Sequence, residues 1–138
     1  MPHLPFEDRS FDLIYCGSVF THIDDLADAW LLELHRILTP EGRLYATIHD
    51  NHTVELFESG KYDSAKIVSH IKARTTYQHA KHTFGMFTTG RDHNSQVFYD
   101  IDYFKKMLHP MFDIASVTQE AYFYQTALVL TRQRTRRS

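Results

Sequence analysis

Small residues follow the first strongly apolar stretch of the chain. Phe11–Tyr15 is nearly all apolar, and Cys16, Gly17 and Ser18 come directly after it. In open α/β sheets, ligands bind beyond the carboxyl ends of the strands, where small residues allow a ligand to approach the backbone. These three residues are therefore candidates for ligand binding. They are also what a tight turn between a strand and a helix requires, and the local pattern leaves both interpretations open.

Ten histidines raise the question of metal binding. The segments HDNH at 49–52 and HAKH at 79–82 each place two imidazoles three residues apart, which puts them on one face if the segment is helical. Neither pair has a carboxylate or thiolate partner fixed by spacing, and the motif HExxH does not occur. Metal-dependent chemistry is therefore the less favoured hypothesis, and we predict no metal site.

The spacing of the apolar residues predicts the elements that position Cys16–Ser18. Phe11–Tyr15 is typical of a central parallel strand buried on both faces. Apolar residues at helical spacing over 23–38 predict an amphipathic helix, with Asp24 or Asp25 as its amino-terminal cap. A turn that contains Pro and Gly ends the helix, and alternating apolar residues over 44–48 begin a second strand. The three elements form a βαβ unit.

The pattern is less regular in the second half of the chain. Residues 51–98 are expected to be a polar insertion, with one helix around Ser64–Arg74. A short helix is predicted from about Asp102 to Leu108. The runs Phe112–Thr118 and Thr126–Thr131 follow, and their short separation predicts an antiparallel hairpin on the edge of the same sheet. The expected fold class is therefore α/β.

Composition narrows the class of protein further. A length of 138 residues predicts a single domain over 1–138. The net charge of −2 gives no field that attracts nucleic acid or an anionic membrane, and no apolar stretch approaches the length of a membrane span. One cysteine excludes an intrachain disulfide, and the first residues do not resemble a signal peptide. We expect a cytoplasmic protein with no nucleic-acid or membrane partner.

Residues 4–50 resemble the middle portion of class I S-adenosylmethionine-dependent methyltransferases. The segment contains Leu-Pro-Phe before an Asp-containing strand, then Ser-Val-Phe-x-His, a helix that ends in Leu-x-Pro-x-Gly, and Arg-Leu at the start of the next strand. The closing segments FDIASVTQ and YQTALVLTRQ also have counterparts in that family. The resemblance implies a partial Rossmann-like methyltransferase sheet, in which parallel strands are followed by an antiparallel carboxyl-terminal hairpin, with flanking helices.

The same resemblance implies S-adenosylmethionine as the cofactor. Leu4, Pro5 and Phe6 would lie near the adenine ring, which needs flat apolar contact. Cys16, Gly17 and Ser18 would line the floor beneath the methionine part, where a close wall aligns the methyl group for in-line attack. In chain order, the implied cofactor-binding residues are Leu4, Pro5, Phe6, Cys16, Gly17 and Ser18.

Three further residues are implied on the substrate side, namely Phe20, His22 and His49. His22 is a candidate general base for a hydroxyl acceptor, because the ordinary pKa of histidine, about 6.5, suits proton removal at neutral pH. The alternative is a histidine at the start of a helix that only hydrogen-bonds a neighbouring loop. The segment SVFTH, followed by AWLLELHRIL, resembles methyltransferases that accompany sugar-modifying enzymes. This favours a small-molecule acceptor, with a saccharide as the first hypothesis.

One departure from the family pattern is important. The sequence has no Gly-x-Gly-x-Gly turn after a first strand and no second strand that ends in an acid for the ribose hydroxyls. We therefore expect a fragment of a longer protein or a degenerate relative with poor cofactor affinity of its own. In that case the strand at Phe11–Tyr15 becomes a bare apolar edge that invites self-association. The alternative function is a non-catalytic, truncated methyltransferase-like module that pairs with a partner chain.

Overall fold

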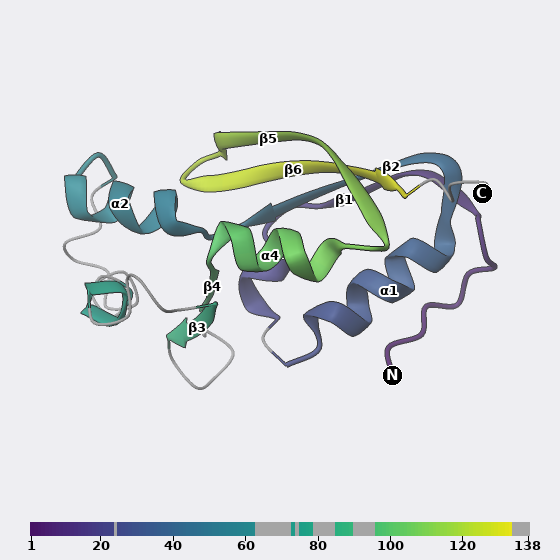
Figure 1. The fold of residues 1–138 in the computed structure, drawn as a ribbon, viewed down its shortest axis with the longest axis horizontal. Helices are drawn as coiled ribbons and strands as arrows, with labels where there is room; N and C mark the ends of the chain where they lie inside the picture. Colours follow the sequence, from purple (N-terminus) through teal and green to yellow (C-terminus); the bar gives the residue numbers. More distant parts are fainter. Residues whose placement is uncertain (24, 63–72, 74, 79–84, 90–95, 134–138) are drawn as a thin grey trace.

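The structure is a computed structural model. It forms a four-stranded sheet with helices packed beneath it and a separate two-stranded sheet (Figure 1). The described residues are 1–23, 25–62, 73, 75–78, 85–89 and 96–133. In chain order the elements are β1 (Phe11–Cys16), the 3-10 helix η1 (Phe20–His22), α1 (Ala27–Ile37), β2 (Leu38–Ile48), α2 (Asn51–Ser59), β3 (Met86–Thr89), β4 (Gln96–Tyr99), α4 (Ile101–Leu108), β5 (Phe112–Tyr122) and β6 (Gln125–Arg132).

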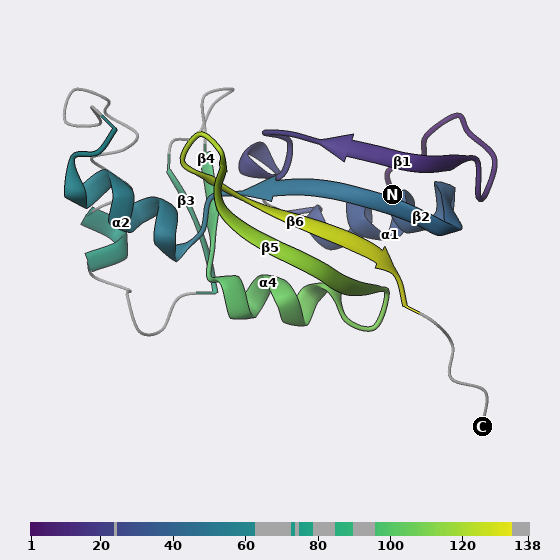
Figure 2. The same ribbon diagram turned by 90° about the horizontal axis from the view of Figure 1, so that it is seen from above.

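The main sheet has the strand order β1-β2-β6-β5, which is seen side by side in Figure 2. β1 runs parallel to β2, with Cys16 opposite Ala46. β6 lies between β2 and β5 and runs antiparallel to both. The predicted α/β class, with parallel strands followed by an antiparallel hairpin, is therefore confirmed.

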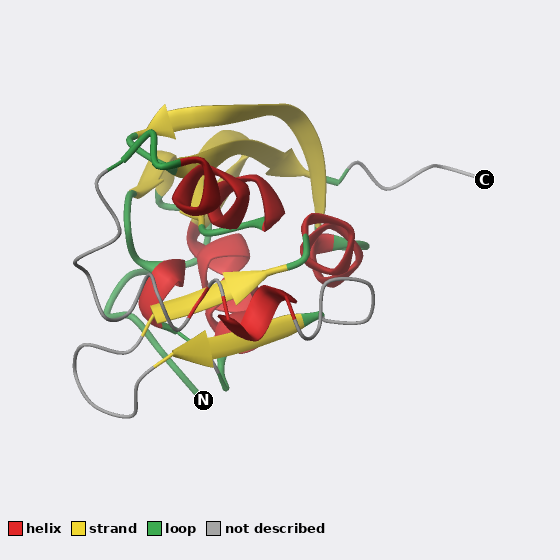
Figure 3. Cartoon of the chain, turned by 90° about the vertical axis from the view of Figure 1, so that its left-hand side faces the viewer, coloured by secondary structure: helices red, strands yellow, loops and turns green. Residues whose placement is uncertain are grey.

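Helices α1 and α4 lie on the same side of the main sheet (Figure 1), and the two-stranded β3–β4 sheet lies on that side as well (Figure 3). Because side chains alternate along a strand, Leu44, Ala46 and Ile48 of β2 all point to that side and are fully buried. Leu128 and Leu130 of β6 are buried opposite them. The core thus fills the space between the sheet and the two helices. No helix in the described part of the chain is long and apolar enough to cross a membrane.

The position of β1 differs from the prediction. The sequence indicated a central strand buried on both faces, but β1 is an edge of the described sheet and pairs only with β2. Leu13 and Tyr15 are 68% and 60% exposed, whereas Cys16 is buried. The physical reason is that α1 covers one face of β1, while no described element covers the other. The strand is the apolar edge expected for a partial sheet.

The start of α1 also differs from the prediction. The helix begins at Ala27, and its cap is Leu26, which forms no side-chain capping hydrogen bond. Asp25 is therefore not the cap, and Asp24 lies outside the described residues. Ile23 has an extended backbone, and its carbonyl accepts a 2.7 Å hydrogen bond from the Tyr99 hydroxyl. This long-range contact holds the chain out of the helical conformation at a point where the apolar spacing alone favoured a helix.

β2 begins earlier than expected, at Leu38, directly after α1. The register with β1 is regular from Leu13 opposite Arg43 onwards, but it is irregular between that pair and Phe11 opposite Leu38. The segment with Pro40 and Gly42 is therefore an irregular first part of the strand rather than a turn before it.

The later elements agree with the prediction more closely. α4 covers the predicted short helix, and Asp100 caps it by accepting a 3.1 Å hydrogen bond from the Tyr103 N–H. β5 and β6 form the predicted antiparallel hairpin, but β6 is inside the sheet and only β5 is at the edge. The helix predicted around Ser64–Arg74 lies almost entirely outside the described residues.

α2 was not predicted from the sequence. Its start is a capping box, in which the Asp50 carboxylate accepts from the Thr53 N–H while the Thr53 hydroxyl accepts from the Asp50 N–H. Gly60 ends the helix in the left-handed conformation, with a φ of 75°. The helix was missed because only four of its residues are buried, which leaves the apolar pattern weak.

Candidate functional site

The turn after β1 brings together the residues that the sequence singled out first. Cys16 is buried beneath α1, and this burial raises the pKa of its thiol to about 11. Gly17 lies against the ring of Tyr15, and a Cβ at this position would come within 2.7 Å of that ring. Ser18 adopts a left-handed backbone with a φ of 59°, which is uncommon for a residue other than glycine. The turn is therefore tight and conformationally restricted.

Three hydrogen bonds hold Ser18 in this conformation. Its N–H donates to the Thr47 hydroxyl over 2.8 Å, and the Thr47 hydroxyl donates to the Gln125 side-chain oxygen over 2.6 Å. The Gln125 side-chain nitrogen donates to the Ser18 hydroxyl over 3.0 Å. Thr47 and Gln125 are both buried, so water does not compete for these bonds.

Thr47 and Gln125 are residues that the sequence interpretation missed. Thr47 is a buried hydroxyl between Ala46 and Ile48 in the apolar last part of β2, and Gln125 is a buried amide at the start of β6. A polar residue in such a strand is a signal that it has a buried partner. The sequence does not say which partner, because Thr47 and Gln125 are 78 residues apart.

The Leu4–Phe6 segment lies at the other end of β1. The Phe6 ring packs edge-on against Phe11, the first residue of β1, with 4.8 Å between the ring centres. Ser18 follows the last residue of β1, so the full length of the strand, roughly 20 Å, separates the two groups. The structure does not bring the two predicted parts of the cofactor site together, and the role of Leu4, Pro5 and Phe6 stays a prediction.

An ion pair on α1 fixes this amino-terminal segment. Glu33, which is buried, accepts a 2.7 Å hydrogen bond from the Leu4 N–H and a 2.5 Å bond from the Arg36 guanidinium. Arg36 also donates to the Leu4 and Phe6 carbonyls, over 3.1 and 2.8 Å. Arg36 first, and then the Leu4 N–H, hold the pKa of Glu33 down at about 2. The Glu33–Arg36 pair thus acts as a clamp on Leu4–Phe6.

The three residues predicted for the substrate side lie in different environments. Phe20 is fully buried and packs against Phe104, and it lines an apolar cavity of about 170 Å³ together with Cys16 and other residues. His22 is exposed at the end of η1. His49 is 2% exposed, and its ring packs against Phe98, with 4.7 Å between the ring centres. Of the three, only His22 has an accessible side chain.

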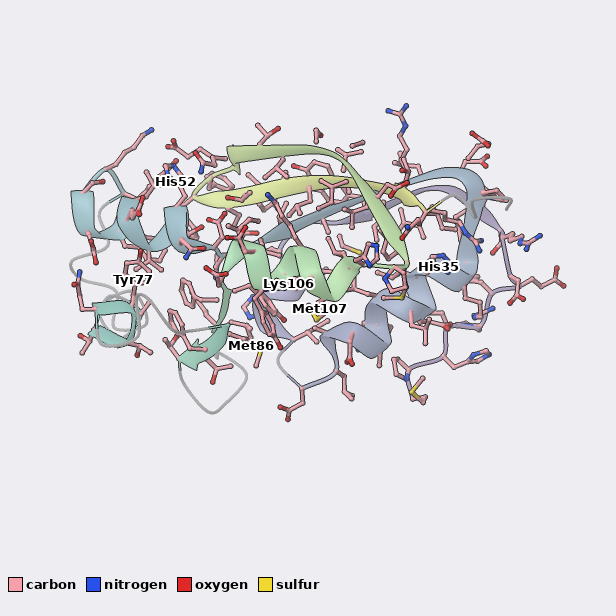
Figure 4. The ribbon with its side chains drawn as sticks, in the orientation of Figure 1. His35, His52, Tyr77, Met86, Lys106 and Met107 are labelled. Carbon is pink, nitrogen blue, oxygen red and sulfur yellow. The ribbon has the colours of Figure 1, made fainter. Side chains whose placement is uncertain are left out.

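A larger cleft lies on the helix side of the molecule. Its volume is about 550 Å³, and its walls come from the start of α1, from β3 and β4, and from α4. Met86, Lys106 and Met107 of this lining lie near one another in Figure 4. The cleft contains none of the predicted site residues. In the described part of the chain, no group of three or more His, Cys, Asp or Glu side chains is arranged to hold a metal ion.

Comparison with known proteins gives a family for part of the chain. Residues 1–46 match a family model described as a methyltransferase domain. No curated protein matches the chain. The match covers β1, α1 and most of β2, which are the elements around the Ser18 turn.

Solved structures match nearly the whole chain in fold. An S-adenosylmethionine-dependent methyltransferase from Methanosarcina mazei has a TM-score of 0.61 and 16% identity, over 96% of this chain and 64% of that one. The 1,6-didemethyltoxoflavin-N1-methyltransferase of Burkholderia thailandensis, solved with 1,6-didemethyltoxoflavin and S-adenosylhomocysteine, has a TM-score of 0.60 and 10% identity, over 94% and 47%. A protein of Pyrococcus horikoshii OT3 has a TM-score of 0.58 and 13% identity, over 94% and 55%.

The family match of residues 1–46 and the likeness in fold to an S-adenosylmethionine-dependent methyltransferase agree with the resemblance of residues 4–50 to the class I family. The chain spans about half to just under two thirds of the length of these solved structures. The Burkholderia structure contains S-adenosylhomocysteine, the demethylated form of the cofactor, which is consistent with the predicted S-adenosylmethionine.

Proposed function

We propose that this chain contributes to an S-adenosylmethionine-dependent methyltransferase that acts on a small-molecule acceptor, with a saccharide as the first class to test. The observation that carries the proposal is the main sheet. Its order, β1-β2-β6-β5, combines a parallel pair with an antiparallel hairpin whose last strand lies inside the sheet. The fold that contains this sheet matches that of a Methanosarcina methyltransferase with a TM-score of 0.61. The small-molecule acceptor in the Burkholderia structure supports the class of substrate.

The turn after β1 is the part that fits the cofactor best. Gly17 is partly buried with the Tyr15 ring on one side of it, and the Ser18 hydroxyl supplies a hydrogen-bonding group beside it. These features suit the polar methionine part of S-adenosylmethionine, and Cys16 would close the floor below. When bound, the cofactor supplies an electrophilic methyl group on a sulfonium. The chain's own residues would orient it and exclude water from it.

His22 is the proposed general base for a hydroxyl acceptor. The proposal is supported by its exposed side chain and by its position four residues after Ser18. In this role the imidazole takes the hydroxyl proton as the oxygen attacks the methyl group. Phe20 and His49 are buried, so a substrate contact at either residue would require the surrounding side chains to move.

The proposal is tested by binding and transfer measurements on the 138-residue chain. Binding of S-adenosylhomocysteine is measured by titration calorimetry, and transfer is measured with radiolabelled S-adenosylmethionine and a panel of saccharide and other small-molecule acceptors. We expect weak but measurable binding in the wild type, because the glycine-rich turn is missing from the sequence, and we expect His22→Asn to abolish transfer without weakening binding further. His109→Asn, an exposed histidine outside the site, is the matched control. Absence of binding at millimolar ligand would contradict the proposal.

A second candidate function is a non-catalytic module that associates with another copy of itself through β1. The observation that favours it is the exposed apolar edge, where Leu13 and Tyr15 are 68% and 60% exposed on a strand paired on one side only. We expect the wild type to dimerise or aggregate with concentration in sedimentation experiments. Leu13→Lys would reduce this association, while Leu32→Lys, an exposed leucine on α1, would not. A monomer at all concentrations would exclude this candidate.

A further inference from the structure

We propose that Thr47 and Gln125 are positioning residues. They lock the Ser18 turn so that the Ser18 hydroxyl keeps its proton for the bound molecule. The inference rests on the proposed function, because it assigns this hydroxyl to the ligand of the turn after β1. It concerns residues of β2 and β6 that the sequence pattern did not connect with the site.

The first step is the direction of the hydrogen bonds. Ser18 donates through its N–H to Thr47, Thr47 donates through its hydroxyl to Gln125, and Gln125 donates through its amide to the Ser18 hydroxyl oxygen. The three groups form a closed ring in which each residue donates once and accepts once. The directions of the two side-chain bonds follow from the orientation of the Gln125 amide, which turns its oxygen to the Thr47 hydroxyl and its nitrogen to the Ser18 hydroxyl.

The second step is to count the protons in the ring. The Thr47 hydroxyl proton and one Gln125 amide proton are both used inside it. The Ser18 hydroxyl accepts from Gln125, and its own proton is not used in the ring. Among the described residues, the nearest group that could accept this proton is the Thr21 hydroxyl. The two oxygens are 3.4 Å apart, which is long for a bond between two hydroxyls. A ligand oxygen above the turn offers this proton a shorter bond.

The third step is the backbone. A left-handed conformation is unfavourable for serine and persists only where its surroundings hold it. Here Thr47 and Gln125 hold the Ser18 backbone, and both are buried on neighbouring strands, since β6 pairs directly with β2. The lock is therefore anchored in the sheet and not in the loop, which is the arrangement expected of a pre-organised site.

The chain offers a matched control for the test. Thr47→Val removes the hydroxyl that accepts from Ser18 and keeps the side-chain shape, whereas Thr47→Ser keeps the hydroxyl. Thr126→Val makes the same change at a fully buried threonine one residue from Gln125, whose hydroxyl has no hydrogen-bond partner among the described residues. A general loss of stability affects both valine variants, but only Thr47→Val opens the ring.

Two measurements are made on each variant of the full chain. The first is the affinity for S-adenosylhomocysteine by titration calorimetry. We expect Thr47→Val to weaken it by tenfold or more, while Thr47→Ser and Thr126→Val stay within about threefold of the wild type, because one lost hydrogen bond to a buried group corresponds to roughly tenfold. The second is hydrogen exchange at the Ser18 amide, which we expect to be faster in Thr47→Val only.

The outcomes separate this inference from the proposed function. If the wild type binds and Thr47→Val binds as well as Thr126→Val, the inference is wrong and the proposed function stands. If the wild type does not bind, the proposed function fails for this chain. Hydrogen exchange at the Ser18 amide then tests whether Thr47 and Gln125 hold the turn. Equal exchange at Ser18 in the two valine variants overturns the inference.

Discussion

The main sheet and the region around α2 are packed from different kinds of side chain. The buried residues between the main sheet and helices α1 and α4 are mostly aliphatic, with Leu31, Leu44 and Leu130 among those fully buried. The cluster around α2 is mostly aromatic, and it contains Phe57 and Phe98 together with Tyr77, Phe87 and the partly buried Tyr124. β4 contributes to both clusters.

The alternation along β4 explains how the two clusters are joined. Phe98 points into the aromatic cluster, while its neighbours Val97 and Tyr99 point into the aliphatic one. The His49 ring packs against Phe98 and Tyr124 at the same junction. Three strand pairings hold the main sheet together, whereas α2 is attached chiefly through the Phe57 ring and the hydrogen bond from the Thr53 hydroxyl to the Tyr124 carbonyl. We infer that the main sheet unfolds as one unit and that α2 opens separately.

The largest expected effect is in the main sheet. Leu44→Ala removes a fully buried side chain from β2 and leaves a cavity, which is expected to lower the free energy of unfolding by about 3 kcal/mol. Denaturant unfolding followed by circular dichroism measures this change. Leu32→Ala on the exposed side of α1 is the control and should have little effect. A similar loss in both variants would contradict the proposed core.

A smaller global effect is expected from the aromatic cluster. Phe57→Ala also truncates a fully buried side chain, but we expect it to lower the global stability by less than half as much as Leu44→Ala. Hydrogen exchange should become faster at the amides of α2, while the amides between β2 and β6 stay protected. If the β2–β6 amides lose protection equally, the two regions form a single cooperative unit and our separation of them is wrong.

The Glu33–Arg36 clamp is expected to make stability depend on pH. Because the folded protein lowers the pKa of Glu33 from its ordinary 4.5 to about 2, the clamp stabilises the fold fully above pH 4.5 and is lost as the pH falls towards 2. Glu33→Gln keeps an acceptor for the Leu4 N–H but removes the charge. Thermal unfolding should show the variant less stable than the wild type at pH 7, with the difference shrinking below pH 4.5. A constant difference down to pH 2 would show that the charge is not responsible.

The smallest effect is expected where the end of β5 meets the segment after α2. Glu120 accepts from Lys61 and lies 3.5 Å from His52, and the Lys61 ammonium holds the pKa of Glu120 below its usual range. The Lys61 side chain is largely exposed, so salt screens the pair and its contribution is small. Glu120→Gln should lower the melting temperature slightly at low salt and not at 1 M salt. A loss that is independent of salt would indicate a structural role instead.

The interpretation of the sequence succeeded where local pattern and chain order are sufficient. α4 was predicted as a short helix from about Asp102 to Leu108, and the β5–β6 hairpin was predicted because two strand-like runs lie close together in the chain. The resemblance of residues 4–50 to methyltransferases gave the order of strand, helix and strand. The interpretation of the sequence failed at the start of α1, where Tyr99 holds Ile23 in an extended conformation from 76 residues away.

The sequence alone determined the fold class, the parallel pair with its connecting helix, and the small residues after β1, because each of these depends on residues close together in the chain. Only the folded structure decided what holds those small residues. Ser18 lies 29 residues from Thr47 and 107 from Gln125, and hydrogen bonds between them exist only once β1, β2 and β6 are assembled. No local pattern carries that information, since it depends on how strands distant in sequence pair with one another.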